Sequence, residues 1–166
     1  MEVKLGDICY PKSKALIIPS NVVGVMTLGV GAKIAEAAST KLVKEVKEYV
    51  ADNKLEVGEN FSTCSGKLKR RGVDRVYHVI IKRLQNDFTS IYIVRNALNK
   101  VMSRVVRDNM ESVTLCGIGI EHGDLDQKTI ARVTVDICRK YDNHVKIKII
   151  DDRKEFITEV DNLIKE

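Results

Sequence analysis

Short apolar runs alternate along the chain with longer segments in which apolar residues recur every three or four positions. The short runs predict β-strands, over Glu2–Leu5, Ala15–Ile18, Asn60–Ser65, Arg75–Ile81, Ser112–Cys116 and Val145–Ile150. The run Val76–Ile81 is nearly continuous in apolar residues, which is typical of a strand covered on both faces. Lys146–Ile150 instead alternates between polar and apolar residues, as a strand with one exposed face does.

The longer segments have the periodicity of amphipathic helices. The first, over residues 30–50, carries an apolar residue at every fourth position: Val30, Ile34, Ala38, Leu42, Val46 and Val50. Further helices are predicted over the apolar faces Ile91–Val105, Ile130–Tyr141 and Phe156–Leu163. Asp152 and Glu155 resemble a capping box, which predicts that the last helix begins there.

This alternation of strands and helices predicts one α/β domain over residues 1–166. The expected architecture is a three-layer α/β/α sandwich with a mixed, largely parallel central sheet. In such sheets, ligands bind at the carboxyl ends of the strands, where loops lead into helix N-termini. The loops after Ile18 and Cys116 are therefore the first places to look for a functional site.

The composition agrees with a globular domain. The chain has 166 residues, of which 44% are hydrophobic and 31% charged, and this argues against a disordered or fibrous protein. No apolar run approaches the roughly 20 residues that span a bilayer. Met1–Leu5 lacks the apolar core of a signal peptide, so we expect the protein to be cytoplasmic.

The net charge of +5 mildly favours anionic partners such as nucleotides, phosphates or nucleic acid, without choosing among them. Cysteines and histidines are dispersed, and no cysteine pair has the C-x-x-C spacing of a zinc or redox site. We therefore expect reduced, mostly buried thiols, no structural metal and no cofactor. The residues concerned are Cys9, Cys64, Cys116, Cys138, His78, His122 and His144.

Three glycine-containing loops follow predicted strands. Ser20–Ala32 runs into a helix, whose free N–H groups form an anion site. Gly117–Asp126 holds three glycines in seven residues, which fits a backbone nest for a phosphate. In Gly6–Ile8, the aspartate either shapes a turn or accepts a hydrogen bond from an amine such as that of adenine. Together the first two loops could hold a diphosphate, although glycines before a helix are also ordinary turn residues.

These segments, in this order, resemble the macro-domain family. Its members open with a strand and Gly-Asp-(Ile/Leu), followed by a strand that ends in an Asn-Ala-Ala-Asn-like run before a Gly-rich loop and helix. The resemblance covers Glu2–Ile150, and the order and spacing of degenerate motifs carry it. The matching segments are Gly6–Ile8, Ala15–Asn21, Leu28–Ala38, Val57–Glu59, a hairpin around Lys67–Gly72, Val76–Val79 and Ser112–Leu125.

The resemblance implies binding of ADP-ribose or a derivative in a cleft between the two loops. The derivatives are ADP-ribosylated protein, O-acetyl-ADP-ribose and ADP-ribose 1″-phosphate. Asp7 would bond the adenine amine, Asn21 would reach the distal ribose, and Gly29–Ala32 and Gly119–Gly123 would hold the diphosphate from two sides. The expected ligand-binding residues are Asp7, Ile8, Ser20, Asn21, Gly29, Val30, Gly31, Ala32, Gly117, Ile118, Gly119, Ile120, Glu121, His122 and Gly123.

Three positions depart from the family pattern. Ile18 replaces the first Asn of the Asn-Ala-Ala-Asn run, and Gly31 stands where some hydrolytic members carry an aspartate, so that acid–base chemistry is not supported. Glu121 stands where a glycine is usual. A carboxylate about 6 Å from a phosphate charge costs roughly 3 kcal/mol at an effective dielectric near 20. Glu121 therefore either points away, accompanies a different ligand pose, or has a role of its own.

A second resemblance, within the family, concerns a branch that removes ADP-ribose from modified glutamates with a lysine nucleophile. Lys82 matches that lysine, while the partner aspartate of the branch aligns with Gly123, next to Asp124. A lysine attacks only when part of it is uncharged, which requires a lowered pKa. The alternative function is thus an ADP-ribosyl hydrolase with the candidate catalytic residues Lys82, Glu121 and Asp124. A surface lysine at a strand end is the simpler interpretation.

A third interpretation is a nucleic-acid or other nucleotide binder with an altered site. The basic run Lys67–Gly72 could contact phosphates, but a solvated turn explains it as well. Only 5% of the residues are aromatic, which gives little support for base stacking. His122 could bond a ligand or simply lie in solvent. The sequence leaves open the natural ligand, turnover and the oligomeric state.

Overall fold

The computed structural model describes residues 1–121 and 125–166. The strands are β1 (Glu2–Leu5), β2 (Ala15–Asn21), β3 (Asn60–Cys64), β4 (Arg75–Lys82), β5 (Ser112–Leu115) and β6 (Lys146–Asp151). They form one sheet in the order β1-β6-β5-β2-β4-β3. Only β3 runs antiparallel to its neighbour within this sheet, and the other neighbouring pairs are parallel. The predicted mixed, largely parallel sheet is confirmed.

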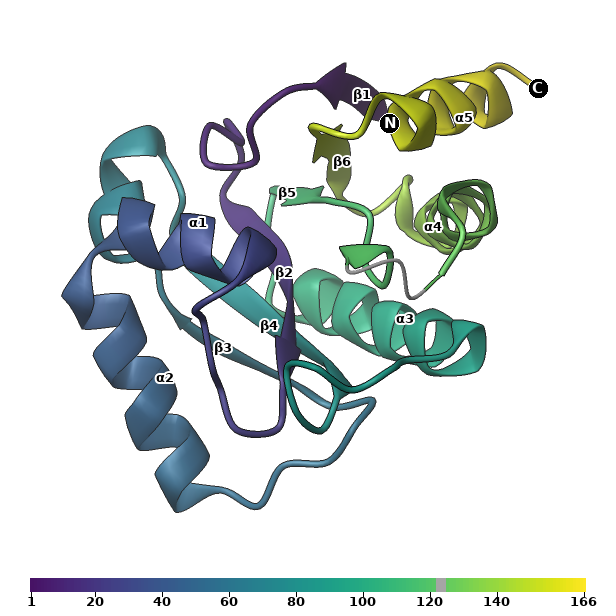
Figure 1. Cartoon of the computed structure of the whole chain (residues 1–166). Coiled ribbons are helices and arrows are strands. Elements are labelled where there is room, and N and C mark those ends of the chain that lie inside the picture. Colours follow the sequence, from purple (N-terminus) through teal and green to yellow (C-terminus); the bar gives the residue numbers. More distant parts are fainter. Residues whose placement is uncertain (122–124) are drawn as a thin grey trace.

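Helices cover both faces of the sheet (Figure 1). On one side lie α1 (Gly29–Ala38), α2 (Thr40–Asp52) and the 3₁₀ helix η1 (Gly66–Arg71), and on the other α3 (Ile91–Arg107), α4 (Gln127–Tyr141) and α5 (Lys154–Lys165). The predicted three-layer α/β/α sandwich is therefore confirmed. Among the helices of the described residues, none is both long and apolar enough to cross a membrane.

Burial follows the position of each strand in the sheet. In β4, every residue after Arg75 is buried, and in β2 all residues except Pro19 are buried. β3, at one edge, alternates between buried and partly exposed residues. The continuous apolar run Val76–Ile81 correctly predicted a strand covered on both faces, because helices pack against both sides of the central strands.

Residues 30–50 do not form the single helix that their periodicity predicted. The helix breaks at Ser39, whose φ of +67° lies outside the helical region, and α2 begins at the next residue. The period of four residues continues through the break, so both helices still present their apolar faces to the sheet.

Two other local predictions are wrong. The basic segment Lys67–Gly72 is not a hairpin but the helix η1, which Gly72 ends in the left-handed conformation. The N-cap of α5 is Arg153, and the side chain of Asp152 pairs with Lys33 of α1 at 2.6 Å instead of capping α5. The capping-box pattern missed this because the pairing joins residues far apart in the sequence.

A stack of three rings lies between α2 and the sheet. Tyr49 stacks on Phe61, and Phe61 stacks on His78, with ring centroids 4.6 Å apart in each pair. His78 is fully buried, and its Nε2 lies 2.9 Å from the hydroxyl of Thr63. Burial lowers the pKa of His78 to about 3, because the charged ring would lose its hydration. The histidine is thus neutral in the folded protein at physiological pH.

We predict that His78 destabilises the folded protein as the pH falls. Unfolded histidine binds a proton below about pH 6.5, whereas His78 in the fold does so only near pH 3, so stability is lost through this window. Between pH 7 and pH 5 this effect amounts to about 2 kcal/mol. Urea unfolding of the native chain at pH 7 and at pH 5 should show this loss in the free energy of unfolding, and His78→Gln should lack it. Equal losses in the two proteins would contradict the prediction.

Candidate functional site

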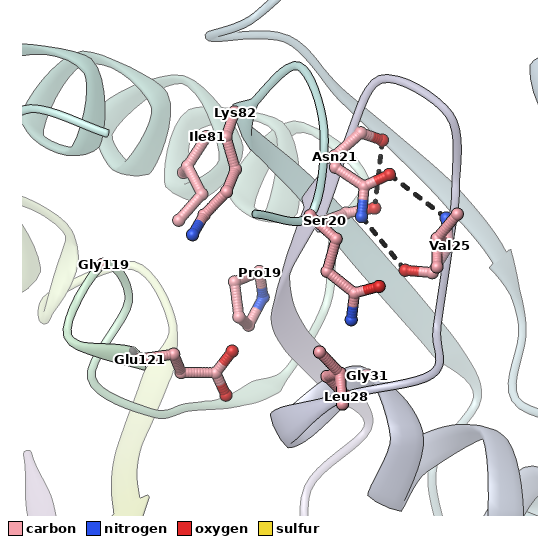
Figure 2. Close-up of a pocket in the computed structure, with 11 residues that line it drawn as sticks. Pro19, Ser20, Asn21, Val25, Leu28, Gly31, Ile81, Lys82, Gly119 and Glu121 are labelled. Carbon is pink, nitrogen blue, oxygen red and sulfur yellow. Dashed lines mark hydrogen bonds between the residues drawn. The ribbon is translucent and has the colours of Figure 1, made fainter. Parts of the chain in front are cut away.

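A pocket opens at the carboxyl end of the sheet, beside the N-terminus of α1 (Figure 2). It contains about 460 Å³ of space, its open mouth included. The ends of β2 and β4 and the loops before α1 and after β5 form its wall. The lining residues are Pro19, Ser20, Asn21, Val25, Leu28, Gly31, Ile81, Lys82, Gln85, Gly119 and Glu121. This is the place where largely parallel α/β sheets bind ligands.

The end of β4 is irregular next to the pocket. Ser20 pairs with Ile80 but Asn21 pairs with Lys82, so the register shifts by one residue. A bulge of this kind changes the direction of side chains, and both Ile81 and Lys82 line the pocket. Lys82 is only 8% exposed and directs its amine into the pocket (Figure 2). Its interpretation as a surface lysine is therefore wrong.

Asn21 shapes the loop that follows β2. Its side-chain amide donates to the carbonyl of Val25 at 3.0 Å and accepts from the amide of Val25 at 3.1 Å (Figure 2). The side chain is nearly fully buried and lines the pocket. Within the described part of the chain, one N–H of this amide and one lone pair of its oxygen have no further partner.

Glu121 points toward the N-terminus of α1. Its Oε1 accepts a hydrogen bond from the backbone N–H of Val30 at 2.8 Å. Leu28, the N-cap of α1, has an apolar side chain that cannot cap the helix. Gly29 makes room for the carboxylate, since its φ is +58° and a Cβ there would lie 2.6 Å from both carboxylate oxygens. The side-chain direction that the sequence left open is therefore inward.

Val30 also contributes to the wall of a second, smaller hollow of about 210 Å³, its open mouth included. Lys33 and Asp152, which form the ion pair between α1 and the loop after β6, line it too. Among the described residues, those that line it are Gly6, Ile8, Val30, Lys33, Cys116, Ile150, Asp151, Asp152 and Arg153. The amide of Val30 and its partner Glu121 thus stand between the two hollows.

Asp151 attaches the loop after β5 to the end of β6. Its carboxylate accepts hydrogen bonds from the amide of Gly117 at 2.9 Å and from the guanidinium of Arg153 at 2.7 Å. Burial acts to lower the pKa of Arg153, but hydrogen bonds and the charge of Asp151 outweigh it and raise that pKa. The amide of Gly117, which we expected to face a ligand, is therefore already bonded within the protein.

Asp7 lies at the exposed end of β1, where its carboxylate accepts a hydrogen bond from the amide of Cys9 at 2.8 Å. Burial, together with the hydrogen bond and charge of Asp7, raises the pKa of the Cys9 thiol to about 11, so the thiol stays protonated. Asp7 therefore acts as the turn former that the sequence offered as one interpretation. The hydrogen bond to Cys9 uses only Oδ1 of Asp7, so a contact of the other carboxylate oxygen with adenine stays a prediction.

Several other expected residues have side chains or amides that are engaged within the protein. Ile118 and Ile120 are 1% and 6% exposed, so their side chains belong to the core. The amide of Ala32 bonds to the carbonyl of Leu28 within the first turn of α1. Three expected residues lie outside the described part of the chain: His122, Gly123 and Asp124.

The basic run of residues 67–72 is partly engaged with its own surroundings. Lys69 pairs with Asp74. The guanidinium of Arg71 lies 4.0 Å from the ring centroid of Tyr10 and donates to the carbonyl of Cys9. All of residues 67–72 are described, and none of them lines either hollow.

Several lining residues were not predicted from the sequence, because the family motifs do not contain them. Gln85 follows Lys82 by three positions and lines the pocket, and its side-chain oxygen accepts a hydrogen bond from the hydroxyl of Thr27 at 3.0 Å. Arg153 follows the end of β6 in the same way. Their position just after the carboxyl ends of strands is the signal that would have found them.

These features define an α/β domain with an anion-binding helix N-terminus between two hollows at the carboxyl end of its sheet. A family model described as Macro domain matches residues 18–134, and the chain belongs to the macro-domain family.

Solved structures agree on the fold. The macrodomain of Mycobacterium tuberculosis DarG superposes with a TM-score of 0.80 at 18% identity, over 90% of this chain and 95% of that chain. A mutant Oceanobacillus iheyensis macrodomain with ADPR gives 0.79 at 16% identity, over 99% and 93%. Thermosipho africanus DarTG in complex with ADP-ribose gives 0.75 at 16% identity, over 90% and 43%. A search of curated protein sequences finds no match.

We predict that Asp151→Ala lowers the free energy of unfolding by about 3 kcal/mol, because it leaves the Gly117 amide and the Arg153 guanidinium without their carboxylate. The neighbouring Asp152→Ala is the matched control. It removes an exposed ion pair, which contributes less than about 1 kcal/mol. Urea unfolding of both variants measures the difference. A similarly small effect in both would show that Asp151 does not anchor the loop.

Proposed function

We propose that this protein binds ADP-ribose, free or as part of a derivative, with the diphosphate at the N-terminus of α1. One observation carries the proposal: the amide of Val30 already binds an anion, the carboxylate of Glu121, at the carboxyl end of the sheet. Free amides and the helix dipole favour negative charge at this point. ADP-ribosylated protein, O-acetyl-ADP-ribose and ADP-ribose 1″-phosphate all contain the same diphosphate.

Family membership supports this proposal. The Thermosipho africanus DarTG structure contains ADP-ribose, and the mutant Oceanobacillus iheyensis macrodomain contains ADPR. The same fold therefore accommodates this ligand in proteins of similar architecture. A fold by itself does not assign a ligand, so the pose below depends on the two hollows and the amide between them.

In the proposed pose, the two hollows take the two ends of the ligand. The larger hollow receives the distal ribose beside Asn21, and the smaller one receives adenine beside Ile8. The adenine amine donates to the carboxylate oxygen of Asp7 that does not bond to Cys9. The diphosphate then crosses the N-terminus of α1 at Val30, in contact with backbone amides rather than with positively charged side chains.

We predict a micromolar dissociation constant for ADP-ribose by calorimetric titration. AMP and ribose 5-phosphate should each bind at least about tenfold more weakly, since neither reaches both hollows. Lack of binding at millimolar ADP-ribose would overturn the proposed function. RNA binding that ADP-ribose does not compete with would instead favour the nucleic-acid interpretation.

The adenine contact has its own test. Asp7→Ala should weaken ADP-ribose about tenfold, the equivalent of one hydrogen bond. Asp52→Ala, an exposed aspartate at the end of α2, is the matched control and should leave the affinity unchanged. An unaltered affinity in Asp7→Ala would show that Asp7 does not contact adenine. It would leave the proposed diphosphate contact at Val30 untouched.

A second candidate function is hydrolysis of an ADP-ribosyl bond, and the position of Lys82 favours it. The buried amine of Lys82 is directed into the hollow that we assign to the distal ribose (Figure 2). An uncharged amine there would bond to the C1″ carbon while that carbon's bond to the modified group breaks. The departing group takes up a proton, and water then releases ADP-ribose from the lysine.

This candidate predicts that Lys82→Ala and Lys82→Arg abolish release of ADP-ribose from an ADP-ribosylated protein, while binding of free ADP-ribose persists. Lys44→Ala, an exposed lysine of α2, is the control. Cyanoborohydride should trap an adduct on the native chain that mass spectrometry places at Lys82. Turnover that persists in Lys82→Ala would exclude this lysine as the nucleophile.

A further inference from the structure

We propose that Glu121 is a tethered anion that occupies the diphosphate position, so that a ligand binds there only by displacing it. The inference rests on the proposed function and concerns how access to the same site is controlled.

The donor at this position is already in use. The N–H of Val30 has one hydrogen, and the Oε1 of Glu121 accepts it at 2.8 Å. A phosphate oxygen that approaches the same hydrogen must replace the carboxylate oxygen or share a bent, weaker bond with it. The most direct anion contact of α1 is therefore not open to a ligand while Glu121 stays in place.

The space at this position is also filled. A glycine before a helix normally lets a ligand come close to the backbone. At Gly29, however, the place of the missing Cβ lies 2.6 Å from both oxygens of the Glu121 carboxylate. The room that Gly29 provides is thus taken by a side chain of the protein itself.

The carboxylate reaches this point from the opposite wall of the cleft. An ordinary N-cap comes from the residue that precedes its own helix, whereas Glu121 lies 91 positions along the chain from Val30 and follows β5. The contact therefore joins the two loops that flank the cleft. It stands between the larger hollow, which Glu121 lines, and the smaller one, which Val30 lines.

The charge of Glu121 also opposes binding of a second anion at this position. Two anions at one helix N-terminus repel each other, and the helix dipole attracts whichever of them is present. The protein's own carboxylate is held at high effective concentration because it is tethered. The fraction of molecules with Glu121 displaced then limits the apparent affinity for a diphosphate.

The experiment compares the native chain with Glu121→Gln, which removes the charge, and Glu121→Ala, which removes the whole group. Calorimetry measures the dissociation constants of ADP-ribose and of adenosine, which carries no phosphate. We expect Glu121→Ala to bind ADP-ribose at least about tenfold more tightly than the native chain, with Glu121→Gln between them. Adenosine should bind all three equally. Glu48→Gln, an exposed glutamate of α2, is the matched control.

Equal or weaker ADP-ribose binding in both Glu121 variants would overturn the inference, and weaker binding would make Glu121 a contact of the ligand. A second measurement separates this failure from that of the proposed function. Pyrophosphate is titrated while the amide resonance of Val30 is followed by NMR. If no protein binds ADP-ribose but pyrophosphate shifts Val30 in Glu121→Ala alone, the proposed function fails and the inference stands. An equal response in native chain and variant, or none in either, overturns the inference.

Discussion

The first backbone N–H groups of α1 have no acceptor within the helix. Much of the candidate site depends on which group of the protein accepts a hydrogen bond from them. Leu28 cannot cap the helix, so Glu121 supplies the acceptor from the loop after β5. This hydrogen bond joins two loops that are far apart in the sequence. It also explains why Gly29 must lack a side chain, and why the cleft is divided into two hollows.

Asp151 and Glu121 each bond to a backbone amide in the loops around the cleft, and their surroundings give them different roles. Asp151 is 3% exposed and bound by the Arg153 guanidinium, so it acts as a fixed anchor for Gly117. Glu121 is only partly buried and lines the pocket, so solvent and ligands can reach it. The Asp151 contact holds the loop after β5 in place, whereas the Glu121 contact is the one that we propose a ligand displaces.

The fold was largely predictable because apolar periodicity reflects which face of an element is buried. The run Val76–Ile81 predicted a strand covered on both faces, and the alternation of strands and helices predicted the layers. The errors lie where one local backbone conformation decides the outcome. Ser39 interrupts a continuous apolar period with a positive φ, and Gly66–Arg71 form a 3₁₀ helix where the sequence predicted a hairpin. Periodicity carries no information about such single dihedral angles.

By itself, the sequence determined the α/β class, the family resemblance and the loops that meet at the carboxyl end of the sheet. It also singled out Glu121 as a departure from the family pattern and Lys82 as a candidate nucleophile, because residue type and spacing are local properties. Only the tertiary structure decided that Glu121 turns onto Val30 and that a bulge directs Lys82 into the pocket. The direction of a side chain depends on which distant backbone donor, charge or void lies next to it. Chain folding, and not local pattern, brings those neighbours together.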